Sequence, residues 1–538
     1  MTTHRTARRL ALAALAAGSL LLTTACNDLA TDPPADGGTV GPAGAAAKPA
    51  GADDPRLGAF YGQHIDWHAC RPDAGSRPVD LTGLQCGELR VPLDYATPGA
   101  DALGVALVRL PAADPAQRVG SLVINPGGPG GSGVEMVEMG RQLFDGALHN
   151  RFDVVGFDPR GTGASSPVTC LTDRQRDDRD QVDIPVDPAK RRVVLEQRDK
   201  EFATACAAKA GKLLPFVGTR NTARDLDVLR QALGDPKLNY LGISYGTYLG
   251  TLYAEEFPAR TGRLILDGAV DPAADTLDES TDQLIGFESS LQRFADDCVR
   301  AHAAECPLGS DPGTAAKKAS DYLESLHDHP LDTADGRKLT SDLSWAGTQA
   351  FLYGDETDAW PALRAALTMA MVRQRGDLLL ASADRFHGRD EKGRYTSLND
   401  SHTAISCADG PAAAPSPERA QKVVAKLKAE APLVTQGVSV EDYQHGRCEN
   451  WPFKTPEKPH VVRAEGSAPI LVVGSTGDPA TPYAAAENLS KGLAHATLLT
   501  REGEGHGAFG RGNTCIDAAY EAYLVAGTMP APGTRCAN

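Results

Sequence analysis

A Gly-x-Ser-x-Gly motif at residues 242–246 constrains the fold of this chain more than any other feature. A mostly apolar run, residues 238–243, leads directly into Ser244. Residues 247–257 are helix-forming, and Pro258 ends them. A strand, a tight turn and a helix in this order form a nucleophile elbow, whose flanking positions tolerate little beyond a hydrogen as side chain. We therefore expect Ser244 to be a nucleophile at a helix N-terminus, where free N–H groups and the helix dipole favour negative charge.

Eight short apolar runs, separated by turn or helix signals, extend this pattern along the chain. They are residues 89–95, 104–110, 121–125, 152–157, 238–243, 263–267, 469–474 and 496–501. Short apolar strands that alternate with helices predict an α/β protein with a mostly parallel sheet and helices on both faces; we expect the first two strands to be antiparallel. Ser244 follows the fifth strand, which is the order of the α/β-hydrolase fold.

The interval between the sixth and seventh strands, residues 268–467, is too long for a loop. It contains four helical patterns, at residues 284–304, 314–327, 359–375 and 417–430. We expect a mostly helical cap here that covers the active site. The remaining core would then consist of an N-terminal part, residues 60–267, and a C-terminal part, residues 468–538.

A serine hydroxyl needs a base to take its proton, and that base needs an acid to hold its tautomer. In this fold the acid and the base follow the serine along the chain. Asp478 comes just after the seventh strand, and His506 lies between glycines beyond the eighth. The positions predict a triad of Ser244, Asp478 and His506.

Other assignments stay open for two of these residues. Asp478 precedes a proline and could be only a turn residue. Asp267 ends the sixth strand, where some hydrolases of this fold carry the acid. His402 and His445 lie in the cap and are weaker candidates for the base.

Attack on a carbonyl also requires two N–H donors for the oxyanion. We expect one from the backbone of Tyr245 and the other from Gly128, in the glycine-rich loop at residues 126–133. This loop lacks both the Gly-Lys-Ser/Thr ending of a phosphate-binding P-loop and the Gly-x-Gly-x-x-Gly spacing of a dinucleotide site. No zinc-ligand spacing occurs either. The sequence therefore implies no cofactor and no metal.

The N-terminal segment is typical of an export signal. Residues 1–25 begin with arginines and continue in an apolar run, residues 10–22, that is too short to span a membrane. The run ends in a segment that resembles a bacterial lipobox, in which Cys26 would be acylated; the alternative is an ordinary signal peptide cut near Ala25. Residues 26–59, rich in Ala, Gly, Pro and Asp, suggest a flexible tether. We expect an extracellular protein, or one held at the outer face of the cell membrane by a lipid.

Charge and cysteine content agree with this location. A net charge of −16 argues against nucleic acid or an anionic membrane surface as a partner. Ten of the eleven cysteines remain when Cys26 is set aside, and an even number in an exported chain suggests disulfides. Sequence does not fix their connectivity. One arrangement joins sequence neighbours: Cys70–Cys86, Cys170–Cys206, Cys298–Cys306, Cys407–Cys448 and Cys515–Cys536.

Several of these segments together resemble the secreted tripeptidyl aminopeptidases of high-GC Gram-positive bacteria, which are relatives of prolyl aminopeptidase. The segments are residues 125–133, 158–163, 221–227, 242–247, 266–268, 478–482 and 505–507. The resemblance runs from about residue 60 to the end and is weakest in the cap. It implies release of short peptides from free N-termini through an acyl-enzyme formed on Ser244, with Asp478 and His506 as acid and base.

An aminopeptidase must bind the ammonium group of its substrate, which requires a carboxylate near the pocket. Asp409 and Glu449 are the candidates in the cap, although each could equally be a solvated surface acid. A bridge between Cys407 and Cys448 would place both acids near one disulfide. Two other functions remain possible: a carboxylic-ester hydrolase with the same triad, and a binding protein without activity.

Overall fold

A mixed sheet of ten strands forms the centre of the computed structural model, which describes residues 51, 53–72, 79–410, 413–453 and 457–537. The strands are β1 (His68–Ala69), β2 (Gln85–Pro92), β3 (Ala102–Leu110), β4 (Gly120–Asn125), β5 (Phe152–Phe157), β6 (Leu238–Ile243), β7 (Thr261–Asp267), β10 (Ile470–Gly477), β11 (Ala496–Glu504) and β12 (Arg535–Ala537). Their order in the sheet is β1-β2-β3-β5-β4-β6-β7-β10-β11-β12. The proposed signal segment and Cys26 lie outside the described residues.

The α/β-hydrolase prediction is confirmed by this topology. All eight expected strands form, and from β5 to β12 every neighbouring pair is parallel. The first two expected strands, β2 and β3, are antiparallel, and β3 is also antiparallel to β5. The sheet has ten strands rather than eight because β1 and β12, of two and three residues, extend its edges. Strands this short carry no readable alternation in the sequence.

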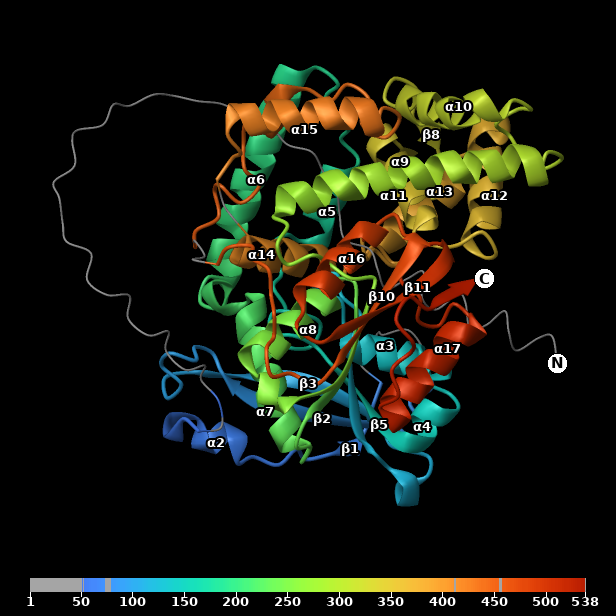
Figure 1. Cartoon of the computed structure of the whole chain (residues 1–538). Helices are drawn as coiled ribbons and strands as arrows, with labels where there is room; N and C mark the ends of the chain where they lie inside the picture. The colour runs from blue at the N-terminus through green and yellow to red at the C-terminus, as the bar shows by residue number, and fades with distance from the viewer. Residues whose placement is uncertain (1–50, 52, 73–78, 411–412, 454–456, 538) are drawn as a thin grey trace.

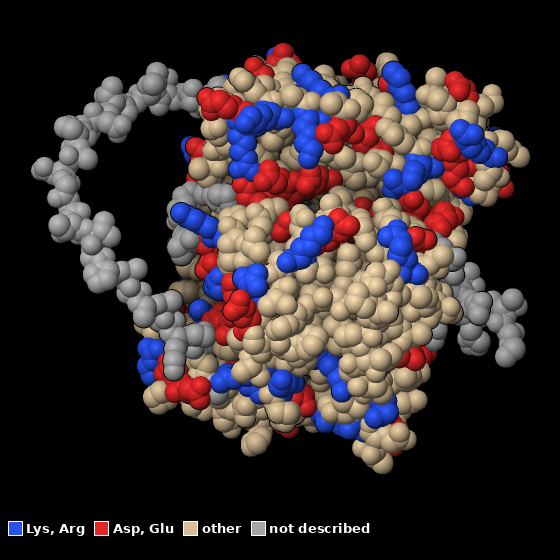
Figure 2. Space-filling view, viewed as in Figure 1, with Lys and Arg blue, Asp and Glu red and all other residues tan. Residues whose placement is uncertain are grey.

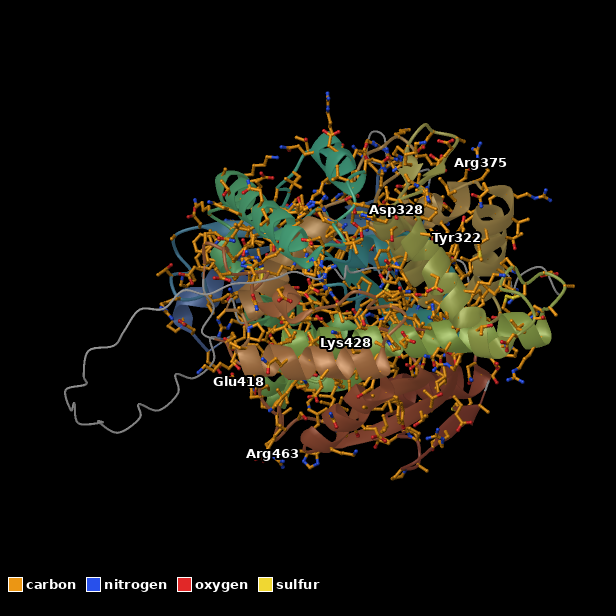
Figure 3. The ribbon with its side chains drawn as sticks, turned by 90° about the horizontal axis from the view of Figure 1, so that it is seen from above. Tyr322, Asp328, Arg375, Glu418, Lys428 and Arg463 are labelled. Atoms are coloured by element: carbon orange, nitrogen blue, oxygen red, sulfur yellow. A yellow bond between two sulfur atoms is a disulfide. The ribbon has the colours of Figure 1, made fainter. Side chains whose placement is uncertain are left out.

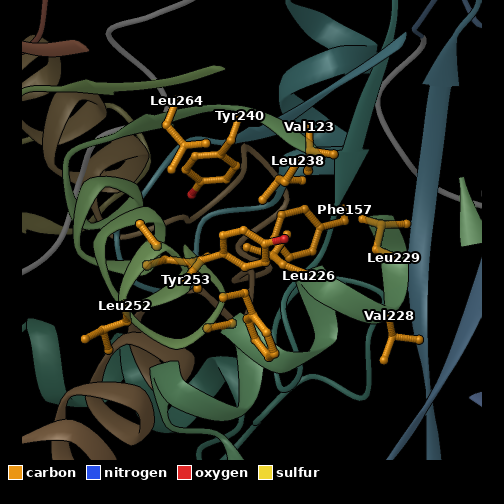
Figure 4. Close-up of a cluster of buried hydrophobic side chains, with 14 of the residues drawn as sticks. Val123, Phe157, Leu226, Val228, Leu229, Leu238, Tyr240, Leu252, Tyr253 and Leu264 are labelled. Atoms are coloured by element: carbon orange, nitrogen blue, oxygen red, sulfur yellow. The ribbon is translucent and has the colours of Figure 1, made fainter. Parts of the chain in front are cut away.

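Helices cover both faces of the sheet, which explains why central strands such as β4 and β5 are buried along their whole length. Helices α7 (Thr219–Ala232), α8 (Tyr245–Glu256) and α16 (Tyr483–Gly492) contribute to one apolar cluster. Figure 4 shows part of it, with Tyr240 of β6 beside Tyr253 of α8. Helices α3 (Gly133–Met139) and α17 (Thr514–Glu521) contribute to the cluster on the other face.

The expected helical cap lies between β7 and β10 (Figure 1). It contains α9 (Thr276–Ala301), α10 (Pro312–Ser325), α11 (Ser341–Leu352), α12 (Ala359–Arg373), α13 (Asp377–Phe386), α14 (Leu398–Asp409) and α15 (Pro417–Glu430), with a small hairpin of β8 (Leu331–Asp332) and β9 (Lys338–Leu339). Helices α9 and α15 run side by side across the top, where Figure 3 labels Glu418 and Lys428 on α15.

Two further helices join the cap from a different part of the chain. Helices α5 (Asp173–Asp180) and α6 (Pro188–Ala210) follow β5 and lie in the cap layer (Figure 1). Arg176 of α5 pairs with Asp400 of α14 at 2.5 Å, and Arg191 of α6 pairs with Asp442 at 2.7 Å. We expected residues 60–267 to belong to the core. The charged sequence of α5 has no apolar stripe that could show in advance which layer it packs against.

Five disulfides occur among the described residues, and all of them join sequence neighbours. This is the arrangement considered from the sequence, and it is typical of proteins that mature in an oxidising compartment. In the described part of the chain, no helix combines the length and the apolar character that a membrane span requires.

Candidate active site

Ser244 lies between β6 and α8 in a backbone conformation that non-glycine residues rarely adopt, with φ 59° and ψ −128°. The surrounding chain holds it there: its N–H donates to the carbonyl of Asp267 at 2.8 Å, and its carbonyl accepts from the N–H of Thr247 at 2.8 Å. The motif requires glycines because the backbone segments on either side of Ser244 approach each other closely. A Cβ on Gly242 would lie 2.3 Å from the carbonyl oxygen of Gly246. The elbow predicted from the sequence is therefore present.

The side chains of Asp478 and His506 contact each other. Nδ1 of His506 donates to the carboxylate of Asp478, at 2.9 Å from Oδ1 and 3.0 Å from Oδ2. The backbone N–H groups of Thr481 and Gly507 also donate to this carboxylate, each at 2.9 Å. Burial alone would raise the pKa of Asp478, but the charge of His506 and these hydrogen bonds together hold it below its usual value. Asp478 is thus an ionised acceptor that fixes the histidine tautomer.

The other ring nitrogen of His506, Nε2, is buried and has no hydrogen-bond partner among the described residues. The end of β7 contacts both Ser244 and the ring of His506. The carbonyl of Asp267 accepts the serine N–H, and a Cβ on the next residue, Gly268, would lie 3.2 Å from Cε1 of His506. Tyr353 of the cap packs its ring edge-on against the imidazole, with centroids 5.4 Å apart. A buried nitrogen without a partner is available to accept a serine proton.

Asp267, the alternative acid, has different partners. Its carboxylate accepts from the backbone N–H groups of Ala508 at 2.8 Å and Phe509 at 2.7 Å, two and three residues after His506. Burial raises the pKa of Asp267. This carboxylate therefore holds the loop that carries the histidine, while Asp478 contacts the ring.

The two expected oxyanion donors lie next to the serine. Tyr245 is the first residue of α8, where backbone N–H groups have no partner within the helix. A Cβ on Gly127 would lie 2.9 Å from Cβ of Ser244 and 3.1 Å from the nitrogen of Tyr245, so the glycine-rich loop packs against the elbow. Neither Tyr245 nor Gly128 donates its backbone N–H to another described residue. Both groups are free to bind a substrate oxygen.

A cavity of about 1120 Å³ connects the core to the cap. Its lining includes Gly128, Ser244, Tyr245 and Asp478 from the core, together with Asp409 from α14. Acidic side chains from the start of α9 also line it: Asp275, Glu279 and Asp282. The cavity is large enough for several peptide residues.

Asp409 is half-buried and close to the elbow. Its carboxylate accepts from the backbone N–H of Thr219 at 2.7 Å and from the hydroxyl of the same residue, which also contacts the hydroxyl of Tyr245. No cation pairs with it within the described residues. Burial raises the pKa of Asp409 to about 7, even though the hydrogen bonds from Thr219 favour the ionised form. An ammonium partner would stabilise the ionised form of this carboxyl.

The remaining candidates of the cap, Glu449, His402 and His445, are not part of the group formed by Asp478 and His506. Glu449 is exposed, absent from the cavity lining, and paired with Nδ1 of His445 at 2.9 Å. The Cys407–Cys448 bridge does bring its chain segment near that of Asp409. His402 lines the cavity, and burial together with the charge of Arg447 lowers its pKa to about 4. Neither His402 nor His445 contacts Asp478.

Three residues that support this site are not predicted from the sequence. Thr481 donates its hydroxyl to Asp478 at 3.1 Å. Thr219 joins Asp409 to Tyr245, and Tyr353 supports His506 from the cap. Thr481 falls within residues 478–482, one of the segments that carry the family resemblance, so the sequence held a signal for it. Thr219 and Tyr353 had none, because their contacts depend on how distant elements pack.

Comparisons with known proteins agree with this geometry. A family model described as TAP-like protein matches residues 435–536. Serine protease Hip1 of Mycobacterium tuberculosis is 40% identical over 495 residues, which cover 90% of this chain and 92% of the relative. A protein of the same organism named carboxylesterase B is 36% identical over 502 residues, 92% of this chain and 94% of the relative. Tripeptidyl aminopeptidase of Streptomyces lividans is 32% identical over 486 residues, 88% of this chain and 86% of the relative.

The sheet order, the serine elbow and these relatives define a serine peptidase of the α/β-hydrolase class. Within that class the chain belongs to the TAP-like family, alongside serine protease Hip1 and tripeptidyl aminopeptidase.

Proposed function

We propose that the chain is an exported serine aminopeptidase of the tripeptidyl type, which releases short peptides from free N-termini. The observation that carries this proposal is the half-buried, unpaired carboxylate of Asp409 in the cavity that also contains Ser244. A serine triad alone would suit many acyl substrates. A carboxylate close to the nucleophile adds a reason to select an amine.

The triad performs the reaction in two stages. Nε2 of His506 takes the proton of Ser244 as Oγ attacks the carbonyl carbon, and the N–H groups of Tyr245 and Gly128 stabilise the resulting oxyanion. Collapse breaks the peptide C–N bond, and His506 gives its proton to the leaving amine. Water then attacks the acyl-enzyme with His506 again as base, which releases the short peptide and restores Ser244.

Substrate selection depends on charge in the cavity. Figure 2 shows acidic side chains gathered in the hollow between cap and core, over the N-terminal part of α9. The residues of this part are Asp275, Asp278, Glu279 and Asp282. Arg419 and Lys426 pair with Asp275, Asp278 and Asp282. With Asp409 included, the acids still outnumber these cations, which favours a substrate ammonium group at the entrance. We propose Asp409 as the residue that binds this ammonium, because it is less exposed than the other candidate, Glu449, and lies beside Tyr245.

The test compares matched peptides with a free or an acetylated N-terminus. The purified protein should release short peptides from the free form, identified by mass spectrometry, and should cleave the acetylated form at least tenfold more slowly. Ser244→Ala should abolish both cleavage and labelling by a fluorophosphonate probe. Equal turnover of free and acetylated peptides would refute the aminopeptidase assignment.

An ester hydrolase with the same triad is the second candidate, and the relative named carboxylesterase B favours it. The two functions differ in what Asp409 does. If the chain is an esterase, Asp409→Asn should leave hydrolysis of a neutral ester unchanged and no free peptide should be cleaved. If it is an aminopeptidase, the same substitution should reduce cleavage of free peptides.

We also propose that the protein is exported with a lipid at Cys26. The signal-like segment at residues 1–25 and the five disulfides support export. Intact-mass measurement of the mature protein should reveal an acylated N-terminal Cys26, and Cys26→Ser should release the protein from the membrane fraction. A mature mass without a lipid would overturn the anchor but not the export.

A further inference from the structure

We propose that Arg447 is the anion-binding residue of the cavity and that it selects peptides with a carboxylate at the third or fourth position. This inference rests on the proposed aminopeptidase function. It concerns a position in the substrate that Asp409 does not reach, and therefore a different part of the specificity.

Four lysine or arginine side chains line the cavity, and three of them already have acidic partners. Arg293 pairs with Glu504 at 2.6 Å, Arg419 with Asp275 at 2.5 Å, and Lys426 with Asp282 at 2.7 Å. The exception is Arg447, which forms no ion pair within the described ranges; its one hydrogen bond there runs from Nη2 to the hydroxyl of Thr403 at 2.7 Å. A guanidinium has five N–H donors, so most of its binding capacity remains unused.

The surroundings of Arg447 hold an excess of positive charge. Arg179 and Arg198 lie nearby, and two carboxylates, Asp199 and Asp180, face this group of three arginines. Burial, and not a neighbouring charge, is the main cause that lowers the pKa of Arg447. Removal from water without a full counter-charge is costly, and a substrate carboxylate would supply that charge.

The position of Arg447 is fixed from two sides. Its neighbour Cys448 is bridged to Cys407 of α14, and Thr403, its hydrogen-bond partner, lies on the same helix. A guanidinium held in this way loses little freedom when it binds a ligand. The arrangement is that of a built binding group and not of a mobile surface arginine.

Helix α14 also sets the distance between the two charges. Asp409 is six residues beyond Thr403, which corresponds to about 9 Å along the helix. An extended peptide covers about 3.3 Å per residue. A substrate with its ammonium at Asp409 that runs along α14 would therefore bring its third or fourth residue to Arg447.

The carboxylate could come from an acidic side chain or from the C-terminus of a very short peptide. One experiment separates the two. The value of kcat/KM is measured for C-terminally amidated octapeptides with Glu or Gln at position three or four, and for tetrapeptides as free acid or amide. We expect wild type to prefer at least one carboxylate form by about tenfold or more, the scale of a charge-assisted hydrogen bond.

Arg447→Gln should reduce that preference to near unity, while Arg447→Lys should keep part of it because the positive charge remains. Lys426→Gln is the matched control: it removes a cavity cation that is already paired, so the preference should persist. Binding of the Glu and Gln peptides to Ser244→Ala, measured by titration calorimetry, gives a readout that is independent of turnover.

Two results would overturn the proposal: a wild type without preference in every pair, or an Arg447→Gln variant that labels normally with the fluorophosphonate probe and keeps the wild-type ratio. If instead no free peptide is cleaved although Ser244 reacts with the probe, the proposed function itself fails. The peptide titration with Ser244→Ala still tests Arg447 in that case.

Discussion

Two buried carboxylates, Asp478 and Asp267, serve the loop that carries His506 in different ways. The first contacts the imidazole, and the second accepts backbone N–H groups just beyond it. We predict that Asp478→Asn lowers kcat by roughly 10³-fold or more with little change in Tm, because the histidine loses the acceptor that fixes its tautomer. Asp267→Asn should instead lower the free energy of unfolding by about 1–3 kcal/mol, with a smaller effect on kcat.

Steady-state kinetics and thermal unfolding of both variants check this prediction. A larger loss of kcat in Asp267→Asn than in Asp478→Asn would reverse the assignment of the catalytic acid.

The proposed role of Asp409 predicts a distinctive pH dependence. Its pKa of about 7 means that the carboxyl is mostly protonated below that pH and cannot pair with an ammonium group. We predict that kcat/KM for a free peptide rises as pH increases through about 7, and falls again above about 8 as the substrate amine loses its proton. In Asp409→Asn, the part of the rise in kcat/KM that comes from ionisation of Asp409 should disappear. The rate of fluorophosphonate labelling, which involves no substrate amine, is the control. Identical peptide profiles in wild type and variant would contradict the role of Asp409.

At the scale of elements, the Cys407–Cys448 bridge fastens the end of α14 to the segment that carries Arg447. It closes a loop with a sequence separation of 41 residues, for which chain entropy predicts about 3–4 kcal/mol of stabilisation. We predict that the double variant Cys407→Ser, Cys448→Ser unfolds at a lower denaturant concentration and has a raised KM for free peptides. The comparison is the double variant Cys298→Ser, Cys306→Ser. It removes a cap disulfide whose cysteines are only eight residues apart in the sequence. An unchanged KM in the first variant would mean that the bridge does not position the binding groups.

The elements also show where sequence reasoning succeeds. Apolar runs predict strands of five or more buried residues, such as β4 and β6. The elbow, Asp478 and His506 could be selected from the sequence because each follows a predicted strand. The edge strands and the cap membership of α5 and α6 depend on tertiary packing and charge pairing, such as Arg176 with Asp400. Contacts of single side chains, like Thr219 with Asp409, depend on distances between elements that are far apart along the chain.

At the scale of the whole molecule, one buried ion pair joins several parts of the core. Arg160, which follows β5, forms two hydrogen bonds with the carboxylate of Asp225 on α7 and also donates to the carbonyls of Pro92 and Leu93 at the end of β2. Burial raises the pKa of Asp225 in spite of this partner. We predict that Arg160→Met destabilises the fold by about 3–5 kcal/mol, because it leaves a buried carboxylate without compensation. Chemical denaturation checks the value; a loss below about 1 kcal/mol would show that solvent reaches Asp225 in the variant.

The order of the strands along the chain has a consequence for the timing of activity. Ser244 is made at the middle of the sequence, but the acid and the base arrive only with β10 and β11, after every helix of the cap. A nascent chain therefore carries its nucleophile without the means to activate it for more than 230 residues, as the positions of Ser244 and Asp478 require. The proposed acid and base are therefore synthesised only after the cap helices that line the cavity, so the complete triad and its cover form together.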